Sequence, residues 1–473
     1  MGGVEKFFKT KNIKEKENMM ANLQQVYGET SWGGQIVDGG PQVFPDQASK
    51  VFGDAGVNPQ VMHDEACWLL ENVGVRLNHP YLIKVLENTG YAGFDASSGR
   101  IHILRPLVDW AIATAPKRSE HPVPSKSFCG GGTAPHVREN GNLVEADVHE
   151  HVAAIAKIAE REGIPSIFRG AGGAHNAYED IEQIRVMREH FSRYIMLYVA
   201  TEEGVKACAQ EYKRNPNMCT SHSLFYSPLQ LNDTGPRTVR YRVNGSRSTS
   251  QLIGNVNVFL RCVEEGLPIY LLTMPISYIT SPATLYGTAV QVHAEFLIGL
   301  CLVQTLNPGL MTIDAAFPQA GDPRHEYNIS FGSLSHNLVN LMAAKVATYL
   351  DLPAIQDGCS AGGKDLDDPT IPADVFRAYR MWNYAYESGW CKWHMVRHCY
   401  GFLNYQMVYD IGKMEKDAAT LKKVLQNNEQ FPIPSEMDVY DPDAIYVIED
   451  VIKNYGGNFK EHPHTLKYST PVL

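Results

Sequence analysis

The sequence predicts an α/β protein built as a (β/α)8 TIM barrel with a mostly helical N-terminal extension. From about residue 126 onward, short apolar runs typical of buried strands alternate with segments of helical periodicity. Such a series implies a parallel sheet, and about eight units favour a closed barrel over an open one. No strand is followed by a glycine-rich nucleotide loop, since "CGGGTAP" at Cys129 lacks the lysine and the spacing of a P-loop.

The chain divides into an extension, residues 1–125, and a barrel with a C-terminal extension, residues 126–473. The first sixteen residues hold five lysines and no apolar core, so we expect a solvated tail and no secretory signal. Three segments of the extension have apolar residues at helical spacing: "VMHDEACWLLENVGV", "HPYLIKVLENTG" and the second half of "GRIHILRPLVDWAIATAP".

The barrel units follow in order along the chain. A helix in "EADVHEHVAAIAKIAEREG" leads to the strand "SIFRGAG", and "YIMLYVA", "MCTSHS", "LPIYLLTMPI", "LMTIDAAF" and "AIQDGC" are the next strands. The helices that follow these strands are expected near residues 178–190, 201–214, 248–265, 282–306, 332–350 and 373–386. Ser281 and Pro282 are typical of an N-cap followed by proline at the first helical position.

Composition limits the classes of function. A hydrophobic content of 44% with 20% charged residues is ordinary for a globular protein, and the most apolar segment still carries Gln291, His293, Glu295 and Gln304, so we expect no membrane span. A formal net charge of −10 argues against a nucleic-acid surface. Nine scattered cysteines without a CxxC pair indicate neither a disulfide framework nor a cysteine zinc site, which favours the cytoplasm.

A polar stripe interrupts the apolar helix expected after Pro282. Thr284, Thr288, Gln291 and Glu295 recur on one helical face. Glu295 would lie about 20 Å from the start of the helix, and a barrel helix runs away from the catalytic face. We therefore expect the stripe to bond a neighbouring helix or subunit, with only its first turn close to the site.

Several stretches together resemble the trimethylamine:corrinoid methyltransferase family, in particular its members that lack pyrrolysine and act on quaternary amines such as glycine betaine. The resemblance lies in "ENVGVRLNHPYLIKVLENTG", "LVDWAIATAP", "GGGTAPHV", "GLPIYLLTMPISYITSPATLYGTAVQVHAEFLIGLCLVQTLNPG" and "YGGNFKEHPHTLKYST", over about residues 60 to 470. It implies a (β/α)8 barrel that moves a methyl group from an amine to the cobalt of a corrinoid bound to a separate carrier protein. It also implies no tightly bound cofactor, no metal and a homo-oligomer.

The chain departs from this family in two places. Gly332, Ser333, Leu334 and Ser335 stand where many relatives have Gly-Ser-Pro-Glu, and His336 follows them. In the segment that resembles Asp-x-Lys-x-x-Asp-x-Gln, Lys364 and Asp367 are kept, but Gly362 and Pro369 occupy the outer positions. Both departures lie near the expected site.

We expect the site residues to position the substrate and to take no covalent part. A quaternary ammonium is bound by the faces of aromatic rings. Tyr278, Tyr327 and Phe331 follow strands, whereas the aromatic residues of "RMWNYAYESGWCKWHMVRHCYGFLNY" are as well explained by the core. For a betaine carboxylate, Arg324, His325 and His336 offer donors near a helix start. His222 and His175 are second choices, and Asp314, Gln356 and Asp357 lie at or near strand ends.

Two alternatives remain open at this point. His394 and His398 are four residues apart, the spacing of two metal ligands on one helical face, which would fit a metal-dependent hydrolase on the same barrel. No glutamate follows the first histidine and no third ligand is identified. A betaine-binding protein without catalysis is the other alternative.

Overall fold

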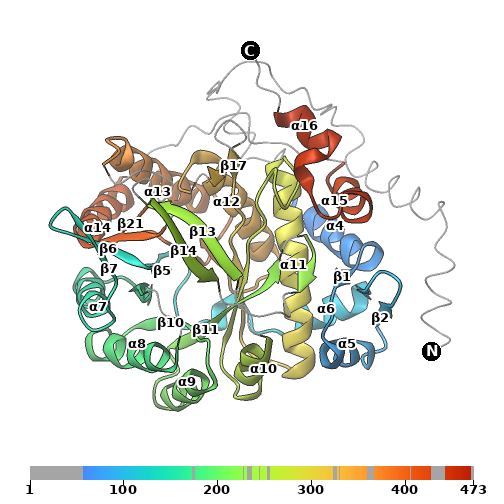
Figure 1. Cartoon of the computed structure of the whole chain (residues 1–473), viewed down its shortest axis with the longest axis horizontal. Helices are drawn as coiled ribbons and strands as arrows, with labels where there is room; N and C mark the ends of the chain where they lie inside the picture. The colour runs from blue at the N-terminus through green and yellow to red at the C-terminus, as the bar shows by residue number, and fades with distance from the viewer. Residues whose placement is uncertain are drawn as a thin grey trace.

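The computed structural model describes most of the chain after residue 56. The described ranges are 57–172, 176–226, 228–231, 237–243, 246–252, 256–322, 328–329, 331–358, 367–404, 406–427, 441 and 443–469. Within them the protein is a mixed α/β structure in which helices surround a parallel sheet (Figure 1).

Residues 57–125 contain helices in the three segments where helical spacing predicts them. Asn58 caps the first described helix, because its side chain accepts hydrogen bonds from the backbone N–H groups of Gln60 and Val61. A small antiparallel group of strands separates the later helices. The elements are α4 (Pro59–Asn72), β1 (Val75–Arg76), α5 (Pro80–Glu87), β2 (Ala92–Asp95), β3 (Arg100–Ile103) and α6 (Arg105–Thr114).

Within the described ranges of the main part, eight parallel strands alternate with eight helices. The strands are β4 (Ser127–Phe128), β8 (Ser166–Phe168), β10 (Tyr194–Tyr198), β11 (Met218–Tyr226), β15 (Ile269–Thr273), β16 (Thr312–Ala316), β19 (Ile355–Asp357) and β20 (Met395–Arg397). The helices are α7 (His151–Glu162), α8 (Ala177–His190), α9 (Glu202–Arg214), α10 (Val256–Glu264), α11 (Leu285–Leu306), α12 (Leu334–Tyr349), α13 (Ile371–Glu387) and α14 (Ile411–Gln426). Figure 1 shows these helices around the outside of the sheet.

The parallel pairings form two runs, β8-β10-β11-β15-β16 and β19-β20-β4. Shorter links join them. Asp314 and Ala354 form a parallel bridge between β16 and the start of β19. After β4, the backbone of Gly130 donates to Ser166 and accepts from Phe168 on β8. Strands that follow one another along the chain are therefore neighbours in the sheet.

One cluster of buried side chains collects residues from all eight strands or their ends, and we call it the inner cluster. Only the concave side of a curved sheet can bring residues of every strand together, so these side chains mark the inside. Its members are Val123, Cys129, Phe168, Tyr194, Met196, Cys219, Tyr270, Leu272, Ile313, Ala315, Phe317, Phe331, Ile355 and Met395.

Hairpins and short helices extend this frame. β13 (Arg237–Val243) and β14 (Ser246–Leu252) pair between β11 and α10 and cross the middle of the view in Figure 1. The others are β5 (Thr133–Ala134), β6 (His136–Glu139), β7 (Asn142–Glu145), β9 (Gly170–Ala171), β12 (Gln230–Leu231), β17 (Gly321–Asp322), β18 (Asn328–Ile329), β21 (Phe402–Leu403), β22 (Val408–Asp410), α15 (Ala444–Asn454) and α16 (Pro463–Ser469).

Two predicted helix starts are wrong. The helix expected from residue 248 begins at Val256, because residues 246–252 form β14. The helix expected from Pro282 begins at Leu285, because the Thr284 side chain accepts from the backbone N–H of Gly287 and supplies the cap. The strand that follows "HCY" and the hairpins after β4 were also absent from the prediction, since two- and three-residue strands leave little periodic signal.

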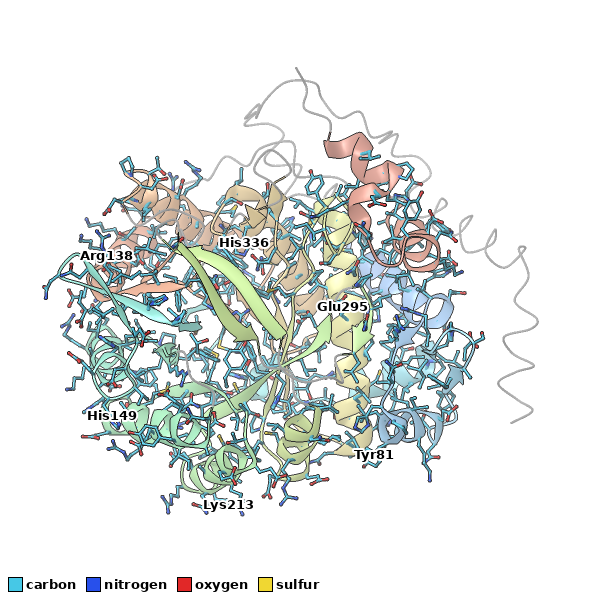
Figure 2. The ribbon with its side chains drawn as sticks, in the orientation of Figure 1. Tyr81, Arg138, His149, Lys213, Glu295 and His336 are labelled. Carbon is cyan, nitrogen blue, oxygen red and sulfur yellow. The ribbon has the colours of Figure 1, made fainter. Side chains whose placement is uncertain are left out.

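The polar stripe of α11 holds the turn before the helix and a loop beside it. Gln291 donates to the carbonyl of Thr280 at 2.8 Å and to Glu295 at 3.1 Å, and Glu295 also accepts from the backbone of Leu229 at 3.1 Å. Figure 2 labels Glu295 along α11 and His336 near α12. The stripe therefore bonds loops of the same chain, a partner that the prediction did not name.

Helix α11 is long and apolar enough to cross a membrane by length and composition, and 89% of its most apolar window is buried inside the protein.

Candidate functional site

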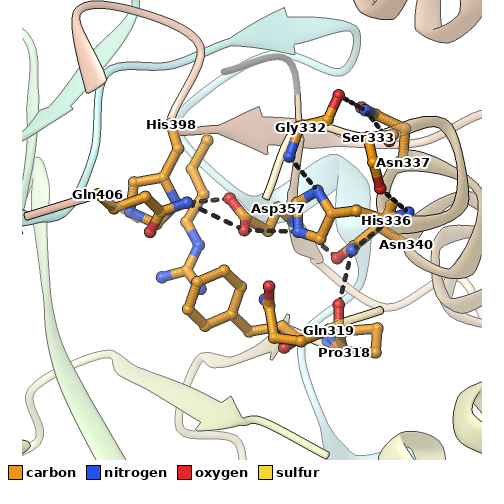
Figure 3. Close-up of polar contacts among 12 residues, drawn as sticks. Pro318, Gln319, Gly332, Ser333, His336, Asn337, Asn340, Asp357, His398 and Gln406 are labelled. Atoms are coloured by element: carbon orange, nitrogen blue, oxygen red, sulfur yellow. Dashed lines mark hydrogen bonds and ion pairs between the residues drawn. The ribbon is translucent and has the colours of Figure 1, made fainter. Parts of the chain in front are cut away.

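A buried carboxylate, Asp357, ends β19 and binds two histidines (Figure 3). Its Oδ2 accepts from His336 Nε2 at 3.0 Å and from Gln406 at 3.3 Å, and its Oδ1 accepts from His398 Nδ1. Asp357 is 0% exposed, and His336 and His398 are 1% and 3% exposed. These groups come from three separate segments, which meet where β19 and β20 end.

The protonation of this network follows from its donors. The backbone N–H of Gly332 donates to His336 Nδ1 at 3.1 Å, so the proton of a neutral His336 is on Nε2 and points at Asp357. Burial by itself would raise the pKa of Asp357, but His398 and His336 outweigh it and hold that pKa well below its usual range. Burial lowers the pKa of His398 to about 4, so its imidazole is neutral at pH 7. The network then carries one negative charge.

Helix α12 fixes His336 in place. The Ser333 side chain caps the helix by accepting from the backbone of His336 at 3.2 Å. One turn later, Asn340 accepts from the backbone of Asp357 at 3.1 Å and donates to the carbonyl of Pro318 at 3.0 Å. These bonds, drawn in Figure 3, tie the loop after β16, the start of α12 and the end of β19 together.

Aromatic rings lie beside this network on the inner side of the sheet. The Phe317 ring lies 5.8 Å from that of Phe331 and 5.4 Å from that of His398, centroid to centroid. Phe331 also meets the edge of His336 at 5.7 Å. Aromatic faces next to an ionised carboxylate are the surroundings that favour a permanent cation.

The glycines of "CGGG" are required because other residues pack closely against them. A Cβ on Gly131 would meet Cβ of Arg397 at 3.2 Å, and a Cβ on Gly132 would lie 2.4 Å from His398 Nε2. Gly132 also has a φ of +107°, which side-chain-bearing residues rarely adopt. The glycines therefore let the end of β4 lie directly against the residues that follow β20.

Three predicted site residues lie at this end of the sheet. Phe331 belongs to the inner cluster, and His336 is at its centre. Both ring nitrogens of His336 are taken by Gly332 and Asp357, so it orients the carboxylate and has no free N–H for a substrate, contrary to the expected direct contact. Tyr278 lies in the loop after β15, which pairs with Gln319 of the loop after β16.

Three other predicted residues, His222, Asp314 and Gln356, face the surrounding helices. The reason is strand parity, because successive side chains point to opposite faces. Asp314 lies between Ile313 and Ala315, and Gln356 between Ile355 and the inward-facing Asp357. His222 contacts the Phe259 ring of α10 at 5.6 Å and bonds Thr220 at 3.0 Å. They therefore lie on the opposite face of the sheet from the inner cluster, and their role in substrate binding stays a prediction.

The remaining predicted residues lie outside the described residues. These are Arg324, His325 and Tyr327 of the loop before β18, His175 after β9, and Gly362 and Lys364 after β19.

Other strand-end residues were underrated. The sequence indicates Asp357 only by its position near a strand end, and it does not single out Phe317 or Arg397. One available signal was the alternation Met395, Val396, Arg397, which puts an arginine on the same face as a buried methionine.

The paired-histidine alternative loses its geometric basis. His394 and His398 flank the strand β20 and do not lie on a helix. His394 packs against His121 at 4.8 Å, centroid to centroid, whereas His398 lies past the other end of the strand. The aromatic residues Trp382, Trp393, Tyr400 and Phe402 are part of the main core, as the alternative explanation of that segment held.

Within the described residues, one group of acidic and histidine side chains has the spacing of a metal site: Glu139, Glu150 and His151. Its histidine is unsuited to a metal. The backbone N–H of Asp147 donates to His151 Nδ1 at 2.8 Å, which leaves the proton on Nε2, 3.2 Å from Glu139. Nε2 then carries a proton where a metal would need a lone pair.

The burial of the Asp314 carboxyl group predicts a pH dependence of stability that can be tested. Burial raises its pKa to about 7, so folding favours the protonated form. The stabilisation from this proton is complete below the unfolded pKa of about 4 and is lost as pH rises through about 7. We expect Asp314→Asn to become more stable relative to the wild type between these pH values, by up to about 4 kcal/mol. Urea unfolding at pH 4, 6 and 8 measures this, and a difference that does not change with pH would contradict it.

Comparison with known proteins points to one family. Residues 254–470 match the model of the family described as trimethylamine methyltransferase (MTTB). The proline betaine:corrinoid methyltransferase of Eubacterium limosum is 33% identical over 113 residues, which cover 24% of this chain and 22% of that protein. The glycine betaine methyltransferase of Desulfitobacterium hafniense is 21% identical over 434 residues, 88% of this chain and 85% of that protein.

More distant similarities are weaker. A trimethylamine methyltransferase of Methanosarcina acetivorans is 24% identical over 332 residues, 65% of this chain and 64% of that protein. Among solved structures, a dihydropteroate synthase from Coxiella burnetii has a TM-score of 0.37 at 12% identity, covering 66% of this chain and 99% of that one. A TM-score this low supports no conclusion about the site. The family match and the named relatives agree with each other, and residues 254–470 of this chain are similar to the trimethylamine methyltransferase (MTTB) family.

Proposed function

We propose that this protein is a methyltransferase that moves a methyl group from a quaternary amine, glycine betaine or a related betaine, to the reduced corrinoid of a partner protein. The observation that carries the proposal is the ring group of Phe317, Phe331 and His398 beside the ionised Asp357. The family match of residues 254–470 and the activities for which the relatives are named support the same chemistry.

In this reaction the main role of the protein is to position the substrate. The reduced corrinoid supplies the nucleophile, and the carbon–nitrogen bonding pair leaves with a neutral tertiary amine, so no proton needs to move. The aromatic faces and the carboxylate replace the water around the cation. Because His398 is neutral at pH 7, it adds no repulsion to that cation. The protein then holds one methyl group in line for attack, which is a contribution of orientation.

We also infer that the eight parallel strands close into a (β/α)8 barrel, with residues 1–125 as the extension. The links between β16 and β19 and between β4 and β8, and the inner cluster fed by every strand, support closure. In such a barrel the substrate enters at the carboxyl ends of the strands, where Asp357 and His398 lie. The partner would dock over the same end.

The proposal includes the cytoplasm as the location and a homo-oligomer as the assembly. Eight described cysteines are free and buried, which suits a reducing compartment. A hydrolase that uses His394 and His398 has no geometric support from their placement on either side of β20.

The test is methyl transfer by the full chain. We expect reduced cobalamin, or its carrier protein, to be methylated in the presence of a betaine and not with trimethylamine, because methyl transfer from trimethylamine would have to expel a dimethylamide anion. The absorbance of methylcobalamin measures the rate for each donor. Comparable rates from both donors, or no transfer from any quaternary amine, would contradict the proposal.

A further inference from the structure

Arg397, the last residue of β20, is a buried cation that has no counter-ion among the described residues. It is 3% exposed, and among the described residues its Nε and Nη2 have no hydrogen-bond partner. A guanidinium removed from water is costly unless a carboxylate or another acceptor replaces the lost hydration. An arginine in this condition indicates an acceptor that binds from outside the chain.

The neighbouring carboxylate does not supply that acceptor. Asp357 is the register partner of Arg397 on β19. Its oxygens, however, are bound by His336, His398 and Gln406 (Figure 3), and no hydrogen bond or ion pair joins them to Arg397 within the described residues. The histidines thus take up the one carboxylate that strand pairing places beside the arginine.

Aromatic residues of the inner cluster hold the guanidinium in place. Its central carbon lies 4.2 Å from the ring centroid of Phe317 and 5.3 Å from that of Tyr270. Stacking on a ring fixes the plane of the guanidinium and leaves its edge, where the N–H groups are, free to meet a planar anion. Phe317 is also the ring that faces Phe331 and His398, so the cation lies beside the ring group of the proposed site.

We propose that Arg397 binds the carboxylate of the substrate and thereby selects trimethylated amino acids over quaternary amines without an acid group. The proposal rests on the proposed function and names the anchor for the acid end of its substrate. In a betaine a short carbon chain separates the carboxylate from the trimethylammonium group. The carboxylate pairs with Arg397, and the trimethylammonium group turns toward Phe331 and Asp357.

The selectivity for betaines follows because the Arg397 guanidinium lacks a partner before the ligand binds. A quaternary amine without a carboxylate leaves Arg397 buried and unpaired after binding, whereas a betaine satisfies it. Sites with a buried polar group that only one ligand satisfies discriminate strongly against the other. We expect glycine betaine to bind the wild-type protein at least about 100-fold more tightly than tetramethylammonium.

The experiment separates the acid end of the ligand from the cationic end. The probes are glycine betaine, tetramethylammonium and 3,3-dimethylbutanoate, which keeps the shape and the carboxylate of glycine betaine but has carbon in place of the charged nitrogen. Calorimetry with the full chain measures each affinity. We expect 3,3-dimethylbutanoate to bind the wild-type protein, and Arg397→Met to lose it and glycine betaine by at least about 100-fold while tetramethylammonium is unaffected.

Two further variants complete the design. Arg138→Met is the matched control, because that arginine pairs with the exposed Asp367 away from the inner cluster, and its ligand affinities should equal those of the wild type. Arg397→Lys keeps the charge without the planar fork and should recover part of the betaine affinity. It replaces Arg397→Met if thermal melting shows that the methionine variant does not fold.

Each outcome bears on the inference. Equal wild-type affinities for tetramethylammonium and glycine betaine, or unchanged betaine affinity in Arg397→Met, would overturn it. Because 3,3-dimethylbutanoate has no methyl group to donate, its binding is independent of methyl transfer. Binding through Arg397 without methylation of cobalamin would remove the proposed function and leave the carboxylate site standing, and methylation that ignores Arg397 would do the reverse.

Discussion

Replacing Asp357 with asparagine should lower kcat/KM for methyl transfer at least about 100-fold while the protein stays folded. The variant loses the negative charge beside the bound cation. The substitution also changes the tautomer of His398. His336 must keep its proton on Nε2 because Gly332 donates to Nδ1. The new amide oxygen therefore faces His336 and its NH2 faces His398, whose proton moves from Nδ1 to Nε2.

Methyl-transfer kinetics and the 15N chemical shifts of the histidine rings measure the two effects separately. Asp367→Asn is the control, because Asp367 is 82% exposed and pairs with Arg138 at 2.6 Å, so its removal should change stability by less than about 1 kcal/mol and leave the kinetics unaltered. Wild-type kinetics in Asp357→Asn would remove Asp357 from the cation site.

The same carboxylate sets a pH dependence of stability. The folded pKa of Asp357 lies below its unfolded value, so its contribution is present above about pH 4 and is lost as the pH falls further. The difference in unfolding free energy between the wild type and Asp357→Asn should therefore be greatest at neutral pH and shrink in acid. Urea titrations at pH 3, 5 and 7 would show this trend.

Replacing Gly132 with alanine should destabilise the protein by roughly 2–4 kcal/mol and displace His398. The added Cβ would lie 2.4 Å from His398 Nε2 and 2.9 Å from Cζ of Phe402, and the φ of +107° is strained for alanine. Gly141→Ala is a matched control, because its φ is +81° but nothing lies within 4 Å of the added carbon. The difference between the two variants in urea unfolding isolates the contact. Equal losses would mean that only backbone strain matters.

The strand and helix series was predictable because each buried strand is a short apolar run and each helix has its own periodicity. The direction of each strand-end residue was not. Strands covered on both faces are buried throughout, as Thr312–Ala316 is, so the presence of a buried core does not tell which side Asp314 faces. The inner cluster settles that question only after strands far apart in sequence are brought together.

The site was recoverable only in part for a related reason. His336 and Phe331 follow a predicted strand closely, and position along the chain was enough to find them. The partners of Asp357 come from residues 21 and 41 positions away, in a segment that the helical spacing of its histidines misrepresents. The importance of Arg397 appears only as a missing contact, which a sequence does not display.

The burial of α11 has a consequence for synthesis. Tyr286 donates to Glu65 and His293 bonds His63, contacts between residues 221 and 230 positions apart, and both residues of the N-terminal side lie on α4. The apolar face of α4 therefore leaves the ribosome long before the helix that covers it. Until Leu306 has emerged, that face depends on chaperones or transient contacts, and nascent chains shorter than this should be readily cleaved by protease within residues 59–72.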